Sequence, residues 1–381
     1  MLVSKSRAWE IIDYDAIAHN VEEIQKLVGN EKIMGIVKAN AYGHGAVECA
    51  KALKAAGVDF FAVATMDEAL QLREGGIEEN ILILGYTPLE HIHYLVEKNL
   101  IQTLVSLDYA KELNTYAKDN NTVIRGHCKV DTGMGRIGIV YQDNHKHMDE
   151  IIEEYQLPNV QVEGIFSHFP ISDELDKKAY SDHQIELFEE VLTSLKEAGI
   201  DPGIRHIQNS YGILNFGDLG YDYCRPGLLY MGVTSDDTIP IASNPDFIPI
   251  MSLYANISMI KEIDKGQSIS YGRHFIAEKP TKVASITIGY ADGLPRICSN
   301  KGLEVLVHGK RCKIIGNICM DQCMVDVTDV EDVKAGDVVC LVGIQGDQRV
   351  TIDEISRKAN TINNETLCGI SARVPRIKKK G

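Results

Sequence analysis

Eight short apolar runs alternate with helical patterns along the first two-thirds of the chain, and this alternation restricts the possible folds more than any other feature. The runs cover residues 33–38, 59–64, 81–84, 101–105, 123–130, 161–168, 204–208 and 221–225. The stretches between them have helical spacing, as in 44–56, where Ala46, Ala50 and Leu53 share one face. Eight strands alternating with helices favour a closed (β/α)8 barrel of the TIM type. An open, doubly wound parallel sheet is the alternative, although it normally has fewer strands over this length.

The pattern changes after about residue 244. Six further apolar runs follow, separated by turns rich in Gly, Asp and Lys: 251–260, 283–289, 304–307, 312–315, 324–327 and 338–342. Strand-like runs with little helical spacing predict a mainly β domain. We therefore expect a barrel domain over 1–244, whose first ten or so residues pack on the second domain, and a β domain over 245–381. The linker between them should lie within 231–247.

Composition excludes several classes of function. The net charge of -15 argues against nucleic acid or an anionic membrane surface as a main partner. Nine cysteines without Cys-x-x-Cys spacing indicate reduced thiols, and neither a disulfide framework nor a metal site. No segment approaches 18 uninterrupted apolar residues, so we expect no membrane-spanning segment in this chain. These features predict a cytoplasmic protein or the cytosolic domain of a membrane-tethered one.

Polar and charged side chains close several of the predicted barrel strands. These ends carry three cations, Lys38, Lys129 and Arg225, together with the imidazole of His168. They also carry the carboxylate of Asp131 and the small polar side chains of Asn209 and Ser210. Catalytic groups of such barrels gather at the carboxyl ends of the strands. We therefore expect these side chains to meet at one mouth of the barrel.

Lys38 is the residue on which covalent chemistry would depend. At the mouth of a buried strand, desolvation lowers the pKa of an amine from about 10.4, and a neutral amine condenses with an aldehyde. The alternative is a strand-end lysine that extends to water. The segments 210–212 and 225–227 expose backbone N–H groups that suit a phosphate. Together these features predict pyridoxal phosphate held by Lys38.

A series of sequence blocks, ordered from the first strand to the C-terminus, resembles the alanine racemase family. The blocks are VKANAYGHG at 37–45, KVDTGMGRIG at 129–138, SHF at 167–169, NS at 209–210, RPG at 225–227, SYG at 270–272, GYADG at 289–293 and CMDQ at 319–322. The ordered set covers essentially the whole chain. The resemblance implies a pyridoxal-phosphate-dependent racemase that interconverts L- and D-alanine and supplies D-amino acid for peptidoglycan precursors.

The resemblance also implies roles for individual residues. Lys38 and Tyr271 would act as the two bases on opposite faces of Cα, with neighbouring cations stabilising the Tyr271 phenolate. Cofactor binding is implied for Lys38, Tyr42, His168, Asn209, Ser210, Arg225 and Gly227. Substrate binding is implied for Arg136, Tyr290, Met320 and Asn364. In the family Tyr271 and Met320 reach the site of a partner subunit, so we expect a homodimer with shared active sites.

Two charged residues carry further expectations from the family. Arg225 would face the pyridine nitrogen of the cofactor, and since a guanidinium can only donate a hydrogen bond, the ring stays unprotonated. A neutral ring limits side reactions and suits simple proton exchange. Lys129 resembles a lysine that is carbamylated in some relatives, where it pairs with the arginine equivalent to Arg136. The unmodified amine is the alternative.

One position departs from the family pattern. The family has a tyrosine shortly before the closing Arg-Val-Pro-Arg, and this chain has Asn364. The smaller side chain leaves room beside the substrate, and its amide can bond to a hydroxymethyl group, so we expect serine as a second substrate. One neutral hydrogen bond is worth roughly 0.5–1.5 kcal/mol, or about 2- to 12-fold for serine. The change resembles serine-type racemases linked to glycopeptide resistance. A strict alanine racemase is the alternative, with Tyr211 refilling the space.

Two other functions share parts of this pattern. A barrel-type amino-acid decarboxylase has the same fold and lysine, and a non-catalytic carrier of pyridoxal phosphate resembles the isolated barrel. The blocks around Tyr271 and at 319–322 argue against a decarboxylase. A β domain with a second base would have no role in a carrier.

Overall fold

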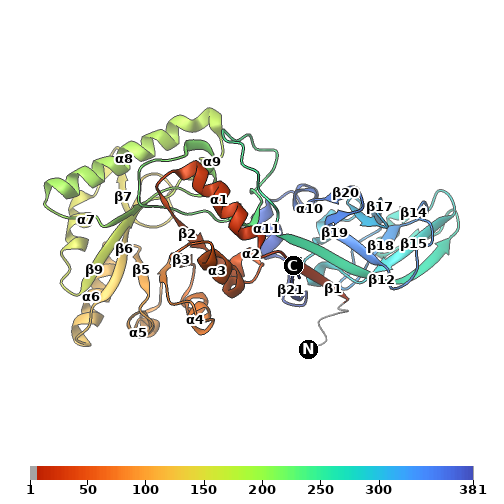
Figure 1. Cartoon of the computed structure of the whole chain (residues 1–381), viewed down its shortest axis with the longest axis horizontal. Helices are drawn as coiled ribbons and strands as arrows, with labels where there is room; N and C mark the ends of the chain where they lie inside the picture. The colour runs from red at the N-terminus through yellow and green to blue at the C-terminus, as the bar shows by residue number, and fades with distance from the viewer. Residues whose placement is uncertain (1–6, 381) are drawn as a thin grey trace.

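The computed structural model describes residues 7–380, which form a barrel domain and a β domain side by side (Figure 1). The eight barrel strands are β2 (Lys32–Ile36), β3 (Phe60–Val63), β4 (Asn80–Ile83), β5 (Ile101–Leu104), β6 (Ile124–Asp131), β9 (Val160–Phe166), β10 (Ile204–His206) and β11 (Tyr223–Cys224). They are hydrogen-bonded in the order β10-β9-β6-β5-β4-β3-β2-β11. Backbone bonds from Asp222 to Arg205 and from Arg225 to Gln208, each 3.0 Å, close the circle between β10 and β11. The predicted (β/α)8 barrel is confirmed.

Helices surround the barrel because both faces of its parallel strands must be buried. They are α1 (Ala16–Val28), α3 (Ala46–Ala55), α4 (Met66–Glu74), α5 (His93–Glu97), α6 (Leu107–Asp119), α7 (Met148–Tyr155), α8 (Lys178–Glu197) and α9 (Ser210–Phe216). Two short strands, β7 (Ile139–Gln142) and β8 (His145–Lys146), extend the edge of β6. A 3-10 turn at Leu229–Met231 leads from the barrel into the linker.

The second domain is mainly β, as predicted. Its sheet contains β1 (Ala8–Ile12), β12 (Met251–Ile263), β15 (Thr281–Ile286), β16 (Glu304–Val307), β17 (Lys310–Ile315), β18 (Cys323–Asp326), β19 (Val338–Gln345), β20 (Gln348–Val350) and β21 (Arg376–Lys378). The order is β20-β19-β16-β17-β18-β15-β12-β1-β21, and a further β19–β12 pairing folds the sheet onto itself. A separate hairpin joins β13 (Ser268–Ile269) to β14 (Phe275–Ile276). The N-terminal strand β1 thus belongs to the β domain, between β12 and β21.

Two short helices of the second domain have no counterpart in the sequence-based expectation. They are α10 (Ile352–Ala359) and α11 (Asn363–Cys368). Helix α10 starts with a capping box between Thr351 and Glu354 and buries Ile352 and Ile355, which is a readable helix signal. Helix α11 has no side-chain cap and packs against the segment that follows Lys38.

Arg376 joins the two domains. Its Nε donates to the carbonyl of Gly43 in the barrel at 2.8 Å and lies 2.9 Å from the carboxylate of Glu10 on β1. Its Nη atoms donate, at 2.7–2.8 Å, to the carbonyls of Ile370, Ser371 and Val374. One half-buried cation therefore fixes the loop after Lys38 against the C-terminal segment.

The described residues include no helix long and apolar enough to cross a membrane. All nine cysteines are free thiols.

Glu154 is a buried carboxyl group on the helical layer around the barrel. It lies on α7, is fully buried, and neither carboxylate oxygen has a hydrogen-bond partner within residues 7–380. Burial raises its pKa from 4.5 to about 8, with the Cys128 thiol opposing part of the rise. The folded chain therefore keeps Glu154 protonated at neutral pH, whereas the unfolded chain ionises it.

This difference predicts a pH dependence of stability. Between pH of about 4.5 and about 8 the folded state binds one more proton than the unfolded state, so the free energy of unfolding falls as the pH rises. The variant Glu154→Gln cannot ionise, so its stability lacks this dependence. The slope that it lacks is at most roughly 1.4 kcal/mol per pH unit. Urea unfolding of both chains at pH 5.5 and pH 8 measures it. The difference in free energy of unfolding, variant minus native chain, should be more positive at pH 8 than at pH 5.5. An equal difference at both pH values would refute the assignment.

Candidate active site

The carboxyl ends of the barrel strands surround a cavity of about 480 Å³. Ten of the residues predicted from the sequence line it: Lys38, Tyr42, Lys129, Arg136, His168, Asn209, Ser210, Arg225, Gly227 and Asn364. Nine come from the barrel and Asn364 comes from α11 of the second domain. The structure thus gathers at one mouth residues that are spread over more than 300 positions of the chain.

Asp131 does not belong to this cavity, although the sequence placed it at the same mouth. Its carboxylate accepts hydrogen bonds from the backbone N–H groups of Gly133, Met134 and Gly135, at 2.8–3.0 Å. Three donors in its own loop satisfy the carboxylate better than the open cavity would. Asp131 therefore shapes the loop that leads to Arg136.

Lys38 is half-buried at the end of β2. Burial and the nearby Arg136 guanidinium lower the pKa of its amine, while the Glu68 carboxylate acts in the opposite direction. A lowered pKa leaves more of the neutral, nucleophilic amine. The environment of Lys38 thus suits a covalent bond to an aldehyde better than a strand-end cation in water.

The segment after Lys38 has a strained backbone. Ala39, Asn40, Ala41 and Tyr42 all have φ between 49° and 54°, and Gly43 follows with φ of 91°. Such left-handed conformations are unfavourable for residues other than glycine and occur mainly at functional sites. The segment, labelled α2, is therefore a left-handed turn. The helix predicted over 44–56 follows it as α3 and begins at Ala46.

Glu68 holds this turn, and sequence analysis missed it. One carboxylate oxygen accepts from the N–H of Ala39 at 2.6 Å, and the other accepts from Ala64 at 2.7 Å and from Thr65 at 3.3 Å. The Thr65–Glu68 pair is a capping box that the sequence could have shown. The additional contact with Ala39 depends on the pairing of β2 with β3 and has no local signal.

The phosphate-sized part of the cavity lies where the left-handed turn meets the last two strands. The hydroxyl of Tyr42 has no hydrogen-bond partner among the described residues, although the side chain is buried. A Cβ atom on Gly227 would lie 2.6 Å from this hydroxyl, so glycine is required there. Ser210 Oγ accepts from the Gly227 N–H at 3.0 Å. The Tyr42 and Ser210 hydroxyls, which can still donate, stand beside a glycine that leaves room, and together they form a cradle that fits a phosphate group.

Asn209 lines the same region but uses its side chain locally. Its Oδ1 accepts from the Gly212 N–H at 2.9 Å and from Ser172 Oγ at 2.8 Å. It therefore caps α9 and positions Ser210.

Arg225 lies at the centre of a buried hydrogen-bond network. Its Nη1 donates to His206 Nδ1 at 2.5 Å, and its Nη2 donates to His168 Nδ1 at 3.2 Å. Nη2 also donates to the carbonyls of Ser167 and Ile207 at 2.7 and 2.9 Å. Burial lowers the pKa of Arg225 to about 9, which leaves it charged at neutral pH.

This network assigns the protons of three histidines. A guanidinium can only donate, so His206 and His168 accept at Nδ1 and carry their protons on Nε2. His206 Nε2 then donates to His127 Nδ1 at 3.0 Å, and His127 Nε2 has no hydrogen-bond partner in residues 7–380. His127 and His206 were not identified from the sequence, because inside an apolar strand a histidine gives no pattern of its own.

Lys129 is an amine buried among cations. Its Nζ donates to the Val130 carbonyl at 2.6 Å, and it is 1% exposed. Burial lowers its pKa to about 7, Asp131 opposes this, and the Arg225 and Arg136 guanidinium groups add to it. A neutral amine in this position can react with carbon dioxide to form a carbamate and release a proton.

Three of the predicted residues lie outside the Lys38 cavity. Tyr271, Met320 and Tyr290 are 69%, 52% and 41% exposed on the surface of the β domain. The turn at Tyr271–Arg273 precedes β14, which lies at the end of the β domain away from the barrel (Figure 1). Tyr290 and Met320 lie on hydrogen-bonded neighbouring segments, with the Ala291 N–H donating to the Met320 carbonyl at 3.0 Å. One chain therefore does not bring Tyr271 to its own Lys38.

The lining of the cavity fits pyridoxal phosphate. Lys38 supplies an amine for the aldehyde, and the cradle of Tyr42, Ser210 and Gly227 supplies donors for the phosphate. Arg225 supplies a donor for a ring nitrogen. The described residues contain no cluster of His, Cys, Asp or Glu that could hold a metal ion.

Comparisons with known proteins agree with this geometry. The alanine racemase N-terminal domain model matches residues 12–235, and the alanine racemase C-terminal domain model matches residues 250–378. Alanine racemase 2 of Caldanaerobacter subterraneus subsp. tengcongensis is 48% identical over 368 residues, which cover 96% of this chain and 93% of the relative. The structure of alanine racemase from Clostridium difficile 630 has a TM-score of 0.90 and 37% identity, covering 98% of this chain and 96% of that chain. That from Bartonella henselae with covalently bound pyridoxal phosphate has a TM-score of 0.85 and 30% identity, covering 98% and 100%.

Glu68 provides a test of how the site sets the reactivity of Lys38. The variant Glu68→Gln removes a negative charge that raises the pKa of the Lys38 amine, so the amine should become reactive at lower pH. Reductive methylation of Lys38 in the cofactor-free chain, followed by mass spectrometry across pH, measures this directly. The control Glu74→Gln changes an exposed residue at the end of the same helix α4 and should leave the profile unchanged. An unaltered profile in Glu68→Gln would contradict the role of Glu68.

Proposed function

The chain belongs to the alanine racemase family of pyridoxal-phosphate-dependent isomerases, and on this basis we propose that it interconverts L- and D-alanine as its principal reaction. The main support for the proposal is the cavity at the barrel mouth, which is lined by Lys38 and nine other residues predicted for the site. The relatives described above are all alanine racemases, which favours alanine over serine. The product would supply D-alanine for peptidoglycan in the cytoplasm.

Different residues of the cavity would bind different parts of the cofactor and substrate. Lys38 would bind the aldehyde of pyridoxal phosphate, Tyr42 and Ser210 its phosphate, and Arg225 its ring nitrogen. Arg136, the other arginine at the cavity wall, would bind the carboxylate of the amino acid. The bound cofactor withdraws electrons from Cα and so acidifies its proton.

Racemisation requires a base on each face of Cα. The lowered pKa of Lys38 suits it to take the proton from one face of Cα in one direction of the reaction and to deliver a proton to that face in the reverse direction. Tyr271 of the partner subunit would serve the opposite face, because the same chain holds its own Tyr271 on the far surface of the β domain. In this proposal the barrel of 1–244 holds the cofactor and the β domain of 245–381 contributes the second base.

The exposed surface around Tyr271 supports a homodimer. Large apolar side chains are exposed on three turns of the β domain, which carry Tyr271, Tyr290 and Ile297. Met320 is exposed on a fourth segment, which is hydrogen-bonded to the turn of Tyr290. Exposed apolar groups of this size mark interaction surfaces. A second copy that covers them would place Tyr271 and Met320 in its own Lys38 cavity.

A two-tag heterodimer tests the shared site. One subunit would carry Lys38→Ala and the other Tyr271→Phe, each inactive as a homodimer. If each site combines Lys38 of one subunit with Tyr271 of the other, the purified heterodimer has one intact site of two and about half the native activity. If both residues came from one chain, the heterodimer would have no intact site and no activity.

Serine is the second candidate substrate, supported by one observation. Asn364 Oδ1 lies buried at the wall of the Lys38 cavity without a hydrogen-bond partner among the described residues. A substrate hydroxyl is a donor that would satisfy it. The Tyr211 ring lines the same cavity, but its hydroxyl is held by the Asp236 carbonyl at 3.2 Å. The link with serine-type racemases of glycopeptide resistance rests on Asn364 alone.

Exchange of the α-proton in deuterium oxide tests the proposed function and its substrate range. The holoenzyme is incubated separately with L-alanine and L-serine, and the D-isomers are quantified. We expect alanine to turn over faster, with serine within about a hundredfold of it. Asn364→Tyr should then slow serine about 2- to 12-fold more than alanine.

Two results would refute parts of the proposal. Serine more than a hundredfold slower than alanine would leave a strict alanine racemase. No exchange with either amino acid, while the cofactor remains bound through Lys38, would refute the racemase and favour a carrier of pyridoxal phosphate.

A further inference from the structure

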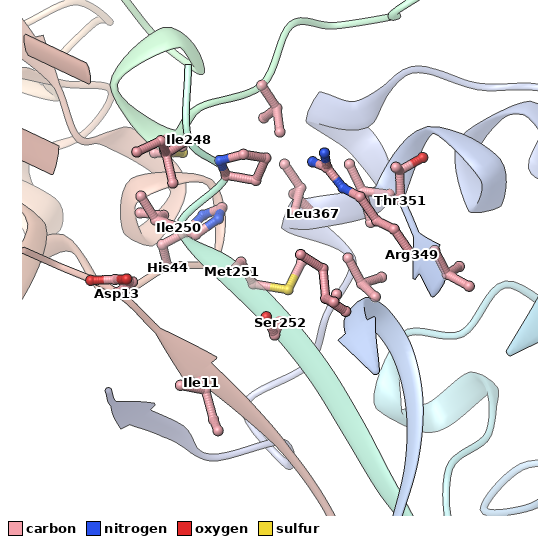
Figure 2. A pocket seen from close by; sticks show the side chains of 18 of the residues that line it. Ile11, Asp13, His44, Ile248, Ile250, Met251, Ser252, Arg349, Thr351 and Leu367 are labelled. Atoms are coloured by element: carbon pink, nitrogen blue, oxygen red, sulfur yellow. The ribbon is translucent and has the colours of Figure 1, made fainter. Parts of the chain in front are cut away.

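A second cavity of about 530 Å³ lies between the barrel and the β domain (Figure 2). Its wall comes from β1, the segment after Lys38, the linker, β12, the β19–β20 hairpin, α10 and α11. It shares no lining residue with the cavity around Lys38. The proposed racemase chemistry does not use it.

Most of the wall is apolar. Side chains from both domains face each other across the cavity, among them Met231, Phe247, Ile250, Met251, Val342 and Leu367. A mostly apolar cavity of this size with a few polar groups is typical of sites for small organic molecules.

His44 presents an unused acceptor to this cavity. The residue is 3% exposed, and its Nδ1 lies 3.0 Å from the Ala41 carbonyl and 3.2 Å from the Tyr42 carbonyl. Contacts with two carbonyls place the proton on Nδ1 and leave Nε2 as an acceptor. Within the described residues Nε2 has no hydrogen-bond partner. Burial lowers the pKa of His44 to about 4, so the ring stays neutral at physiological pH.

Arg349 provides a positive charge on the opposite wall. Figure 2 shows its side chain extending from β20 with the guanidinium facing the cavity, across from His44. This guanidinium forms no ion pair and no side-chain hydrogen bond with any residue in 7–380. An arginine without a partner beside an apolar wall is well suited to bind a carboxylate.

The other charged groups of the wall already have partners. Lys379 pairs with Asp13 at 2.6 Å. The Asp353 carboxylate accepts from Asn363 Nδ2 at 2.6 Å and from the Asp237 N–H at 3.1 Å. Arg349 is an exposed residue, and it is the charged group of this wall whose side chain makes no ion pair or hydrogen bond in the part of the chain described.

We propose that the interdomain cavity binds a small amphipathic carboxylate. Its carboxylate pairs with Arg349, its apolar body fills the space between the domains, and a hydroxyl or N–H group donates to His44 Nε2. Such a ligand contacts both the turn that follows Lys38 and, through Leu367, the helix that carries Asn364. The proposal does not depend on the racemase activity.

Titration calorimetry of the holoenzyme with 4-hydroxyphenylacetate tests it. This probe has the three required groups, and two analogues each remove one of them. Phenylacetate lacks the donor for His44 and should bind about fivefold more weakly. The neutral 4-hydroxyphenylacetamide lacks the charge for Arg349 and should bind at least about tenfold more weakly. Each titration is repeated with saturating alanine, which occupies the Lys38 cavity and should leave binding of the probe unchanged.

Variants locate the site independently of the analogues. Arg349→Met should weaken binding of 4-hydroxyphenylacetate about tenfold or more, whereas Lys313→Met, at an exposed position of β17 outside the cavity, should not. Ser252→Phe places a ring in the cavity and should abolish binding, and racemisation by this variant shows that it is folded. Absence of binding, loss of binding with alanine, or equal affinity in Arg349→Met and the native enzyme would each overturn the proposal.

Discussion

The arrangement of the site depends on the hydrogen bonds of one half-buried group, the guanidinium of Arg376. It bonds to the Gly43 carbonyl, where the left-handed turn ends, and to the Ile370 carbonyl just beyond α11. The turn and the helix are so close that a Cβ atom on Gly43 would lie 2.6 Å from the Leu367 carbonyl. Its ion-pair partner Glu10 has a pKa raised by burial to about 7, so near neutral pH the cation relies mainly on carbonyl acceptors. Arg376 thereby positions the turn that follows Lys38 relative to the helix that carries Asn364.

The cavity around Lys38 has an excess of positive charge. Lys129, Arg136 and Arg225 face it, and Asp131, the nearest strand-end carboxylate, is used by its own loop. The guanidinium groups of Arg136 and Arg225 contribute to lowering the pKa values of the Lys38 and Lys129 amines. An anionic cofactor and an anionic substrate relieve this repulsion. The electrostatics of the mouth thus select ligands that carry phosphate and carboxylate groups.

The barrel could be predicted because strands buried on both faces give continuous apolar runs, such as 33–37 and 81–84. The residues at the strand ends could be predicted because parallel strands end at one mouth. The left-handed turn could not, since Ala39 to Tyr42 contains no glycine, and a contact from Glu68 on another βα unit holds it. Nor could the His206–His127 chain, because the pairing of β10, β9 and β6 brings these residues together only inside the barrel.

The position of β1 has a consequence for how the chain folds. In the β-domain sheet Ala8 pairs with Ala255 and Glu10 with Arg376, so the barrel is in effect inserted into a sheet whose strands come from both ends of the chain. The strands β1 and β21 are parallel neighbours in this sheet. Pairings between such distant residues form slowly. During synthesis β1 must therefore wait until β12 and β21, which follow the whole barrel in the sequence, have emerged before it can pair with them.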